Sequence, residues 1–222
     1  VLRAMMRAWM AAIARTTTSG THRIGDLRGR PVIAVSNHLS YADTTATECA
    51  LLRAGGAARA LADRWWVLAG PKVWDEPLHA IASAALNLVP TPQSRRIGAA
   101  PSEVAGVLRA LTLARARLAA GDPLLVYPEG TRSRTGQLGP FLAGVRHYLT
   151  VPGSVVLPIA LSGTDRLYPV DGRRISPAAI HVSVGAPIEV DDPVRALIEA
   201  HRAVAALLPD GYRPAAGTAE VV

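Results

Sequence analysis

The chain has 222 residues, of which 50% are hydrophobic and 18% are charged, so one domain can bury a sizeable core. Its formal net charge of +7 favours anionic partners, but nucleic acid is excluded because the chain lacks a lysine-rich run, zinc-finger spacing and an aromatic RNA-binding strand. The single cysteine, Cys49, excludes an intrachain disulfide and a cysteine-based zinc site.

Residues 1–15 predict an amphipathic helix, which belongs to an N-terminal segment over 1–28. Apolar side chains recur at helical spacing at Leu2, Met5, Met6, Trp9, Met10 and Ile13. Arg3 and Arg7 fall on another face, and they leave the helix too short and too charged for a signal peptide or a membrane span. Two interpretations stay open: the apolar stripe lies in a membrane interface, or it packs on the domain.

The first polar block covers residues 37–43 and reads Asn-His-Leu-Ser-Tyr-Ala-Asp. It follows an apolar, β-branched run over 31–36 that predicts a buried strand, and it precedes a predicted helix over 44–52. Site residues of α/β folds commonly lie where a strand ends and a helix begins. Asp43 is close enough to hold one imidazole nitrogen of His38 and leave the other free to take a proton. A surface histidine bonded to a helix-capping aspartate is the alternative.

A cluster of tryptophans follows, at Trp65, Trp66 and Trp74. These rings either form an exposed aromatic belt at a lipid surface or place at least one indole in the core. The elements predicted next are a helix over 77–86, a strand over 87–90, a helix over 101–121 and a strand over 122–127.

The second polar block covers residues 128–132 and reads Pro-Glu-Gly-Thr-Arg. Gly130 lets the backbone approach a ligand, and the amides of Gly130 and Thr131 can point at an anion. Arg132 offers a planar fork for bidentate contact with phosphate. Glu129 either accepts a hydrogen bond from a hydroxyl of that ligand or holds Arg132 in place. A tight turn stabilised by a Glu–Arg pair is the purely structural alternative.

The C-terminal third continues the alternation of strands and helices. We predict a helical segment over 141–149, strands over 155–161 and 180–185, a helix over 193–208 and a loose tail over 211–222. This alternation predicts an α/β fold with a mixed, mostly parallel sheet covered by helices.

Taken together, residues 37–43 and 127–136 resemble the signature blocks of the glycerolipid acyltransferase family, the lysophosphatidic acid acyltransferases and their relatives. Residues 141–144, with the pattern Phe-x-x-Gly, and residues 155–159 resemble further blocks in the same order. The resemblance covers about residues 30 to 165. It implies a glycerol-3-phosphate acyltransferase-like fold, which we assign to a domain over 29–210.

The resemblance implies transfer of an acyl chain from acyl-CoA or acyl-carrier protein to a hydroxyl of a lysophospholipid or glycerol-phosphate acceptor. The reaction needs no cofactor and forms no covalent acyl-enzyme. In the family pattern His38 is the general base and Asp43 its orienting partner. The positions that match acceptor-binding blocks are Glu129, Gly130, Thr131, Arg132 and Pro158. A peripheral location on the cytoplasmic face of the cell membrane is expected.

One family block is missing. The pattern Gly-x-x-Phe-x-x-Arg has no counterpart in residues 85–91, which contain no arginine and no aromatic residue. Arg95 or Arg96, a few residues further on, is expected to supply that positive charge. The acceptor therefore need not be plain lysophosphatidic acid.

The same residues bear on other functions. A hydrolase is disfavoured because no Gly-x-Ser-x-Gly motif supplies a nucleophile. His38 and Asp43 lack further ligands at metal-binding spacing, so we predict no metal site. An acyltransferase with another lipid acceptor and a non-enzymatic, basic lipid-binding module remain alternatives.

Overall fold

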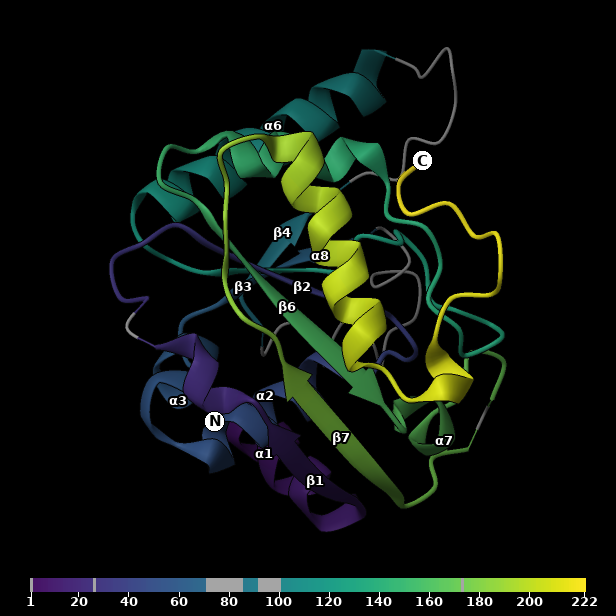
Figure 1. The fold of residues 1–222 in the computed structure, drawn as a ribbon. Coiled ribbons are helices and arrows are strands. Elements are labelled where there is room, and N and C mark those ends of the chain that lie inside the picture. The colour runs from purple at the N-terminus through teal and green to yellow at the C-terminus, as the bar shows by residue number, and fades with distance from the viewer. Residues whose placement is uncertain (1, 26, 71–85, 92–100, 173) are drawn as a thin grey trace.

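The computed structural model describes residues 2–25, 27–70, 86–91, 101–172 and 174–222 (Figure 1). Within these residues the strands form one eight-stranded sheet with the order β1-β7-β6-β2-β5-β3-β4, and β8 pairs with β6. The strands are β1 (Ala14–Ser19), β2 (Val32–Ser36), β3 (Trp66–Ala69), β4 (Leu88–Pro90), β5 (Leu124–Val126), β6 (Val155–Ser162), β7 (Ala178–Val184) and β8 (Ile188–Glu189).

The sheet is mixed and mostly parallel, as predicted. Strands β2 to β6 run in one direction, whereas β7 and β8 are antiparallel to β6, and β1 is parallel to β7. Every residue of β2 is buried: Val32 and Ala34 face one core cluster, while Ile33 and Val35 face the other. Burial on both faces explains why this strand reads as a continuous apolar run.

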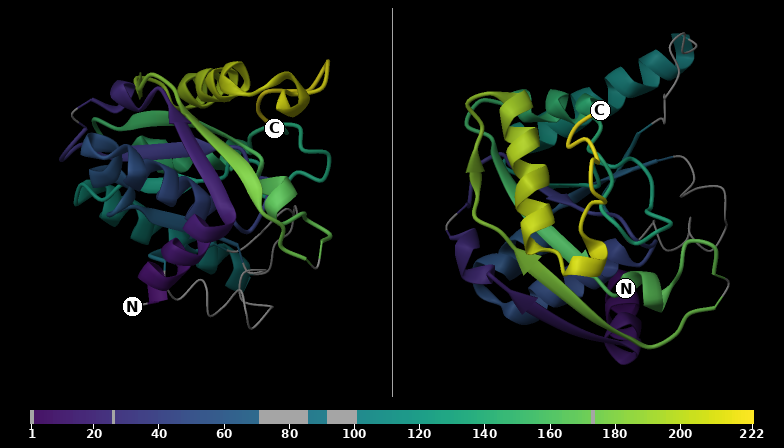
Figure 2. Two further views of the ribbon diagram at one scale, coloured as in Figure 1. Left: turned by 90° about the horizontal axis from the view of Figure 1, so that it is seen from below. Right: turned by 45° about the vertical axis from the view of Figure 1, so that its right-hand side comes forward.

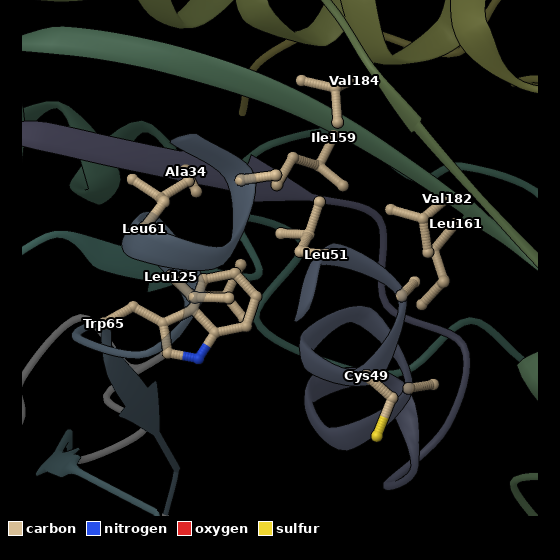
Figure 3. Packing of buried hydrophobic residues seen from close by; sticks show 14 of the residues in the cluster. Ala34, Cys49, Leu51, Leu61, Trp65, Leu125, Ile159, Leu161, Val182 and Val184 are labelled. Carbon is tan, nitrogen blue, oxygen red and sulfur yellow. The ribbon is translucent and has the colours of Figure 1, made fainter. Parts of the chain in front are cut away.

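Helices cover both faces of the sheet (Figures 1 and 2). The helices are α1 (Leu2–Ile13), α2 (Asp43–Ala54), α3 (Gly56–Ala62), α6 (Pro101–Ala119), α7 (Thr164–Leu167) and α8 (Pro193–Leu207), with 3-10 turns η1 (Thr21–Ile24), η2 (Ala143–Thr150) and η3 (Asp210–Tyr212). Helices α1, α2 and α3 share one core cluster with the sheet, and α6, η2 and α8 share the other. Figure 3 shows Leu51, Leu61 and Trp65 of the first cluster beside Leu125 and Ile159 of the sheet.

The N-terminal helix packs on the domain through its arginines. Arg3 and Arg7 both donate to Glu48 of α2, whose carboxylate is fully buried. Met10 is buried, whereas Met5 is 63% exposed and Trp9 is 46% exposed. The packing interpretation therefore holds for one side of α1, and part of the apolar stripe still faces outward.

The sheet starts earlier in the chain than predicted. Residues 14–19, placed in the N-terminal segment over 1–28, form β1 and pair in parallel with β7 along six positions. The boundary between that segment and the domain therefore lies near residue 13. A pairing partner more than 160 residues away leaves no local signal in a short run of threonines.

The tryptophans do not form one exposed belt. Trp65 is buried in the core. Trp66 lies in β3, and the guanidinium of Arg117 sits 4.0 Å from its ring centroid. Trp74 and nearly all of the predicted helix over 77–86 lie outside the described residues. Among the described helices, none is both long and apolar enough to cross a membrane.

The tail over 211–222 is bound to the domain and is not loose (Figure 2). The amide of Val222 donates to the carbonyl of Phe141 at 2.9 Å, and the amide of Phe141 donates to Glu220 at 2.9 Å. The Tyr212 hydroxyl donates to Asp165 at 2.9 Å. An extended backbone segment can pair its N–H and C=O groups with those of another extended segment. The composition of the tail does not reveal such pairing. Within the helical segment predicted over 141–149, residues 143–149 belong to the 3-10 helix η2, whereas Phe141 forms an isolated bridge with Val221.

Candidate active site

The two polar blocks meet at one edge of the sheet. Strands β2 and β5 are parallel neighbours, and Val35 is paired with Val126. His38 and Glu129 each lie three residues beyond that pair, so the chain leaves the sheet at the same level on both strands. The amide of His38 donates to Glu129 Oε1 at 2.8 Å, and the amide of Ser133 donates to the carbonyl of His38 at 2.7 Å.

His38 and Asp43 form the predicted pair. Nδ1 of His38 lies 2.7 Å from Asp43 Oδ2. The same oxygen accepts from the amides of Leu39 at 2.6 Å and Ser40 at 2.9 Å. Asp43 is the first residue of α2 and is fully buried, and the positive end of the helix dipole favours a carboxylate there. With Nδ1 held by Asp43, Nε2 has no bonded partner among the described residues and is the nitrogen that can accept a proton.

Tyr127, which was not among the predicted site residues, covers one face of the imidazole. The two rings are stacked, with centroids 4.2 Å apart and an interplanar angle of 19°. The Tyr127 hydroxyl lies 3.0 Å from the hydroxyl of Thr44, the residue after Asp43. Its position at the end of the strand before Glu129 was the available signal.

Asn37 extends the pairing between β2 and β6 beyond the last strand residue. Its side-chain amide donates to the carbonyl of Leu161 at 2.8 Å, and its side-chain oxygen accepts from the Leu161 amide at 2.8 Å. These two hydrogen bonds fix the residue immediately before His38. Asn37 is thus a second positioning group that was not predicted.

Glu129 ties backbone segments together. Its Oε1 accepts from His38, and its Oε2 accepts from the Gly139 amide at 2.9 Å. The side chain is buried, and burial raises the pKa of Glu129 to about 7. Both carboxylate oxygens therefore bond to backbone amides, and neither of the two roles predicted for Glu129 is seen in this arrangement.

Arg132 is placed by the first polar block. Its guanidinium lies 3.6 Å from the ring centroid of Tyr41, a cation–π contact. Within the described part of the chain, neither Arg132 nor Arg134 has an ion pair or side-chain hydrogen bond. Gly130 has a φ of +67°, a left-handed conformation that favours glycine and lets the turn bend between Glu129 and Arg132.

A hollow of about 430 Å³ lies beside this turn. Arg132, Arg134 and Thr131 line one side of it, and Ala215 and Thr218 of the C-terminal tail line another. Two guanidinium groups in one hollow, with hydroxyl and backbone donors nearby, form a suitable environment for a phosphate.

Three predicted site residues remain, of which the structure describes only Pro158. Arg95 and Arg96 lie outside the described residues. Pro158 is buried within β6, where it pairs with Val35, so it lies inside the sheet and away from the polar turns. It falls between the stretches of β6 that pair with β8 and with β7, where a missing N–H costs little. Among the described side chains, no group of three His, Cys, Asp or Glu residues is arranged to bind a metal.

Comparisons with known proteins show the family of the chain. The family model described as Acyltransferase matches residues 15–162. The 1-acyl-sn-glycerol-3-phosphate acyltransferase of Cocos nucifera is 38% identical over 80 residues, which cover 36% of this chain and 26% of that protein. The enzyme of the same name from Limnanthes douglasii is 38% identical over 69 residues, covering 31% and 25%. The chain therefore spans about a quarter of the length of these curated relatives.

The fold also matches a solved structure. The crystal structure of the 1-acyl-sn-glycerophosphate (LPA) acyltransferase PlsC from Thermotoga maritima superposes with a TM-score of 0.61 and 22% sequence identity. The match covers 85% of this chain and 67% of that chain. The predicted glycerol-3-phosphate acyltransferase-like fold is thereby confirmed.

Proposed function

The chain belongs to the acyltransferase family, and we propose on this basis that it transfers an acyl chain from a thioester to a hydroxyl of a lysophospholipid or glycerol-phosphate acceptor. The observation that carries the proposal is the meeting of the His38–Asp43 pair with the turn that bears Arg132. The curated relatives named 1-acyl-sn-glycerol-3-phosphate acyltransferase support an acceptor that carries a phosphate.

In the proposed reaction, Nε2 of His38 takes the proton of the acceptor hydroxyl. The hydroxyl oxygen attacks the thioester carbonyl, a new C–O bond forms, and the tetrahedral intermediate expels the thiolate. The imidazolium then returns the proton to the sulfur, giving a free thiol and an ester. Asp43 stabilises the imidazolium through Nδ1, and general-base help of this kind contributes on the order of 10²–10⁴-fold in rate. No acyl-enzyme is needed.

The acceptor phosphate is assigned to Arg132, with Arg134 and Thr131 as further donors. The Gly130 amide, predicted to point at the anion, instead donates to the carbonyl of Tyr127 at 3.1 Å. Arg132 is suited to this role because Tyr41 holds its guanidinium without using its N–H donors in an ion pair. Glu129 acts by fixing the backbone of His38 and the turn, and not as a ligand of the acceptor.

The thioester donor is acyl-CoA or acyl-carrier protein, both of which are anionic and suit a chain with a net charge of +7.

We also propose a peripheral location on the cytoplasmic face of the cell membrane. Support comes from α1, whose arginines bond to Glu48 while Met5 and Trp9 stay exposed. Trp9→Ser should weaken binding to anionic vesicles about tenfold, as measured by co-sedimentation, and leave activity in detergent unchanged. Unchanged vesicle binding would contradict the membrane role of α1.

The function is tested by acyl transfer from radiolabelled palmitoyl-CoA and palmitoyl-acyl-carrier protein to a panel of lysophospholipids. His38→Ala should abolish transfer and leave the melting temperature close to that of the wild type. His147→Ala is the matched control, because His147 is an exposed histidine of η2. Transfer that persists in His38→Ala would show that the base lies elsewhere. Vesicle binding by a wild-type protein that transfers no acyl chain would favour a lipid-binding module.

A further inference from the structure

The imidazole of His38 is held at its edge and on one face by two different elements. Asp43 binds the edge through Nδ1 at 2.7 Å. The Tyr127 ring lies 4.2 Å away and is inclined by only 19°, so it lies nearly parallel to the face of the imidazole. Asp43 fixes rotation of the imidazole within its plane, and Tyr127 limits tilting of that plane.

The Tyr127 ring is itself fixed by the helix that carries Asp43. Its hydroxyl lies 3.0 Å from Thr44 Oγ1, and Thr44 follows Asp43 in the first turn of α2. Two consecutive residues of one helix therefore hold the two members of the ring stack. Because α2 is anchored in the core through Ala46, Ala50 and Leu51, the stack rests on a rigid support.

Tyr127 does not supply a proton itself. Burial raises the pKa of its hydroxyl well above the usual value, so the group stays neutral near pH 7. Its effect on the reaction must come from the ring face. An aromatic face attracts a cation, and the imidazole becomes cationic only when it has taken the proton of the acceptor. The contact is therefore stronger in the transition state than in the ground state.

We propose that Tyr127, fixed by Thr44, is a positioning residue that holds the His38 imidazole and stabilises its protonated form during acyl transfer. The inference rests on the proposed function, since it assumes that His38 is the base. It predicts that loss of the ring lowers kcat and leaves the KM of the acceptor almost unchanged, because Tyr127 lies behind the imidazole and not in the phosphate hollow.

The test compares four variants in acyl transfer from palmitoyl-CoA to lysophosphatidate. Tyr127→Leu removes the ring and should lower kcat about 3- to 30-fold, with less than a twofold change in the acceptor KM. Tyr127→Phe and Thr44→Val each remove the hydroxyl contact but keep the ring, and each should retain kcat within about threefold. The double variant Tyr127→Phe/Thr44→Val should be no slower than the slower single variant, since both changes delete one interaction.

Tyr148→Leu is the matched control for loss of a buried tyrosine. Tyr148 lies in η2 and packs in the other core cluster, away from His38. It should lower the melting temperature and leave kcat per folded molecule unchanged. A Tyr127→Leu variant with wild-type kcat, or a Tyr127→Phe variant as slow as Tyr127→Leu, would overturn the assignment.

An NMR measurement separates this inference from the proposed function. The ring current of a stacked tyrosine shifts the imidazole protons of His38 upfield, so Tyr127→Leu should move them downfield while Tyr127→Phe leaves them in place. If these shifts are seen but the wild-type protein transfers no acyl chain, the proposed function fails and the contact stands. If wild-type transfer is robust and the shifts do not change, the positioning role of Tyr127 fails alone.

Discussion

Around His38, protein groups fix both the backbone and the ring, whereas the guanidinium of Arg132 rests on a single aromatic ring. The amide, carbonyl and Nδ1 of His38 all form hydrogen bonds within the protein, and Tyr127 covers one face. Arg132 contacts Tyr41 and, within the described residues, forms no ion pair. The proposed base is thus preorganised for one geometry, while the guanidinium of Arg132 keeps its donors available for a ligand.

This difference suits the two tasks. A proton-accepting nitrogen must lie within a few tenths of an ångström of its hydrogen-bonding position, so mobility in His38 costs rate. A phosphate-binding arginine gains its partners only when the acceptor arrives, so prior pairing would compete with the substrate. Variants of the two turns should therefore fail in different kinetic parameters.

The largest effect is expected at Asp43. Asp43→Asn keeps the size of the side chain but removes the negative charge that orients and stabilises the imidazole. We expect kcat to fall on the order of 10²–10⁴-fold with little change in the acceptor KM. Steady-state kinetics with varied lysophosphatidate measures both parameters. An equal loss in kcat and gain in the acceptor KM would contradict the expectation that the two turns act on different kinetic parameters.

Glu129 should show the next largest effect, as a pH dependence of stability. The pKa of Glu129 is raised from 4.5 to about 7, so between these values the folded protein keeps a proton that the unfolded chain releases. The wild type therefore loses stability as pH rises through this window, and Glu129→Gln does not. As pH rises through this window, the free energy of unfolding of Glu129→Gln should therefore increase relative to that of the wild type by on the order of 3 kcal/mol.

Urea unfolding at about pH 5 and about pH 7.5 measures this shift. Glu199→Gln is the control, because Glu199 is an exposed residue of α8 whose change should give parallel pH profiles. Parallel profiles for Glu129→Gln as well would show that the carboxyl is already ionised in the folded protein at low pH.

Arg132 should affect binding more than turnover. Arg132→Ala is expected to raise the KM of a phosphorylated acceptor about 10- to 100-fold, the value of one charge-assisted contact, with kcat changed less. Arg146→Ala, at an exposed arginine of η2, is the matched control. If an acceptor without a phosphate is preferred and its KM is unaffected by Arg132→Ala, the assignment of the phosphate to this turn is wrong.

The smallest effect is expected at Gly130. Its φ of +67° is unfavourable for a residue with a Cβ, so Gly130→Ala should lower the free energy of unfolding by about 1 kcal/mol and raise the acceptor KM a few-fold. Gly144→Ala is the control, since a Cβ there meets no atom within 4 Å. Differential scanning calorimetry and the same kinetic assay measure both changes. An unchanged melting temperature and KM would show that the turn tolerates another conformation.

The elements that carry the site were accessible from the sequence because their signals are local. The buried runs of β2 and β5 and the polar residues that follow them predicted where His38, Asp43 and Arg132 would lie. The order of strands was not accessible, since it depends on pairing between distant segments. Once β2 and β5 are neighbours, the equal offset of His38 and Glu129 from the Val35–Val126 pair brings them together.

Roles that depend on geometry could not be read from residue types. Glu129 was expected to face a ligand or Arg132, yet its oxygens bond to backbone amides contributed by His38 and Gly139. Tyr127 was not predicted, because its residue type and its place at the end of a strand do not reveal that its ring stacks on His38. The tail was expected to be loose because chain termini commonly are. Its hydrogen bonds form with residues near Phe141, about eighty positions earlier, and pairing at this separation leaves no local signal.

Strand β1 sets a limit on how far the chain can be shortened at its N-terminus. It pairs with β7 over six positions and forms one border of the sheet. Removal of the residues before 14 would leave this border intact. Removal up to residue 28 would expose a row of unsatisfied N–H and C=O groups along β7, a template for strand addition between molecules. Such a protein should self-associate, even though it retains His38, Asp43 and Arg132.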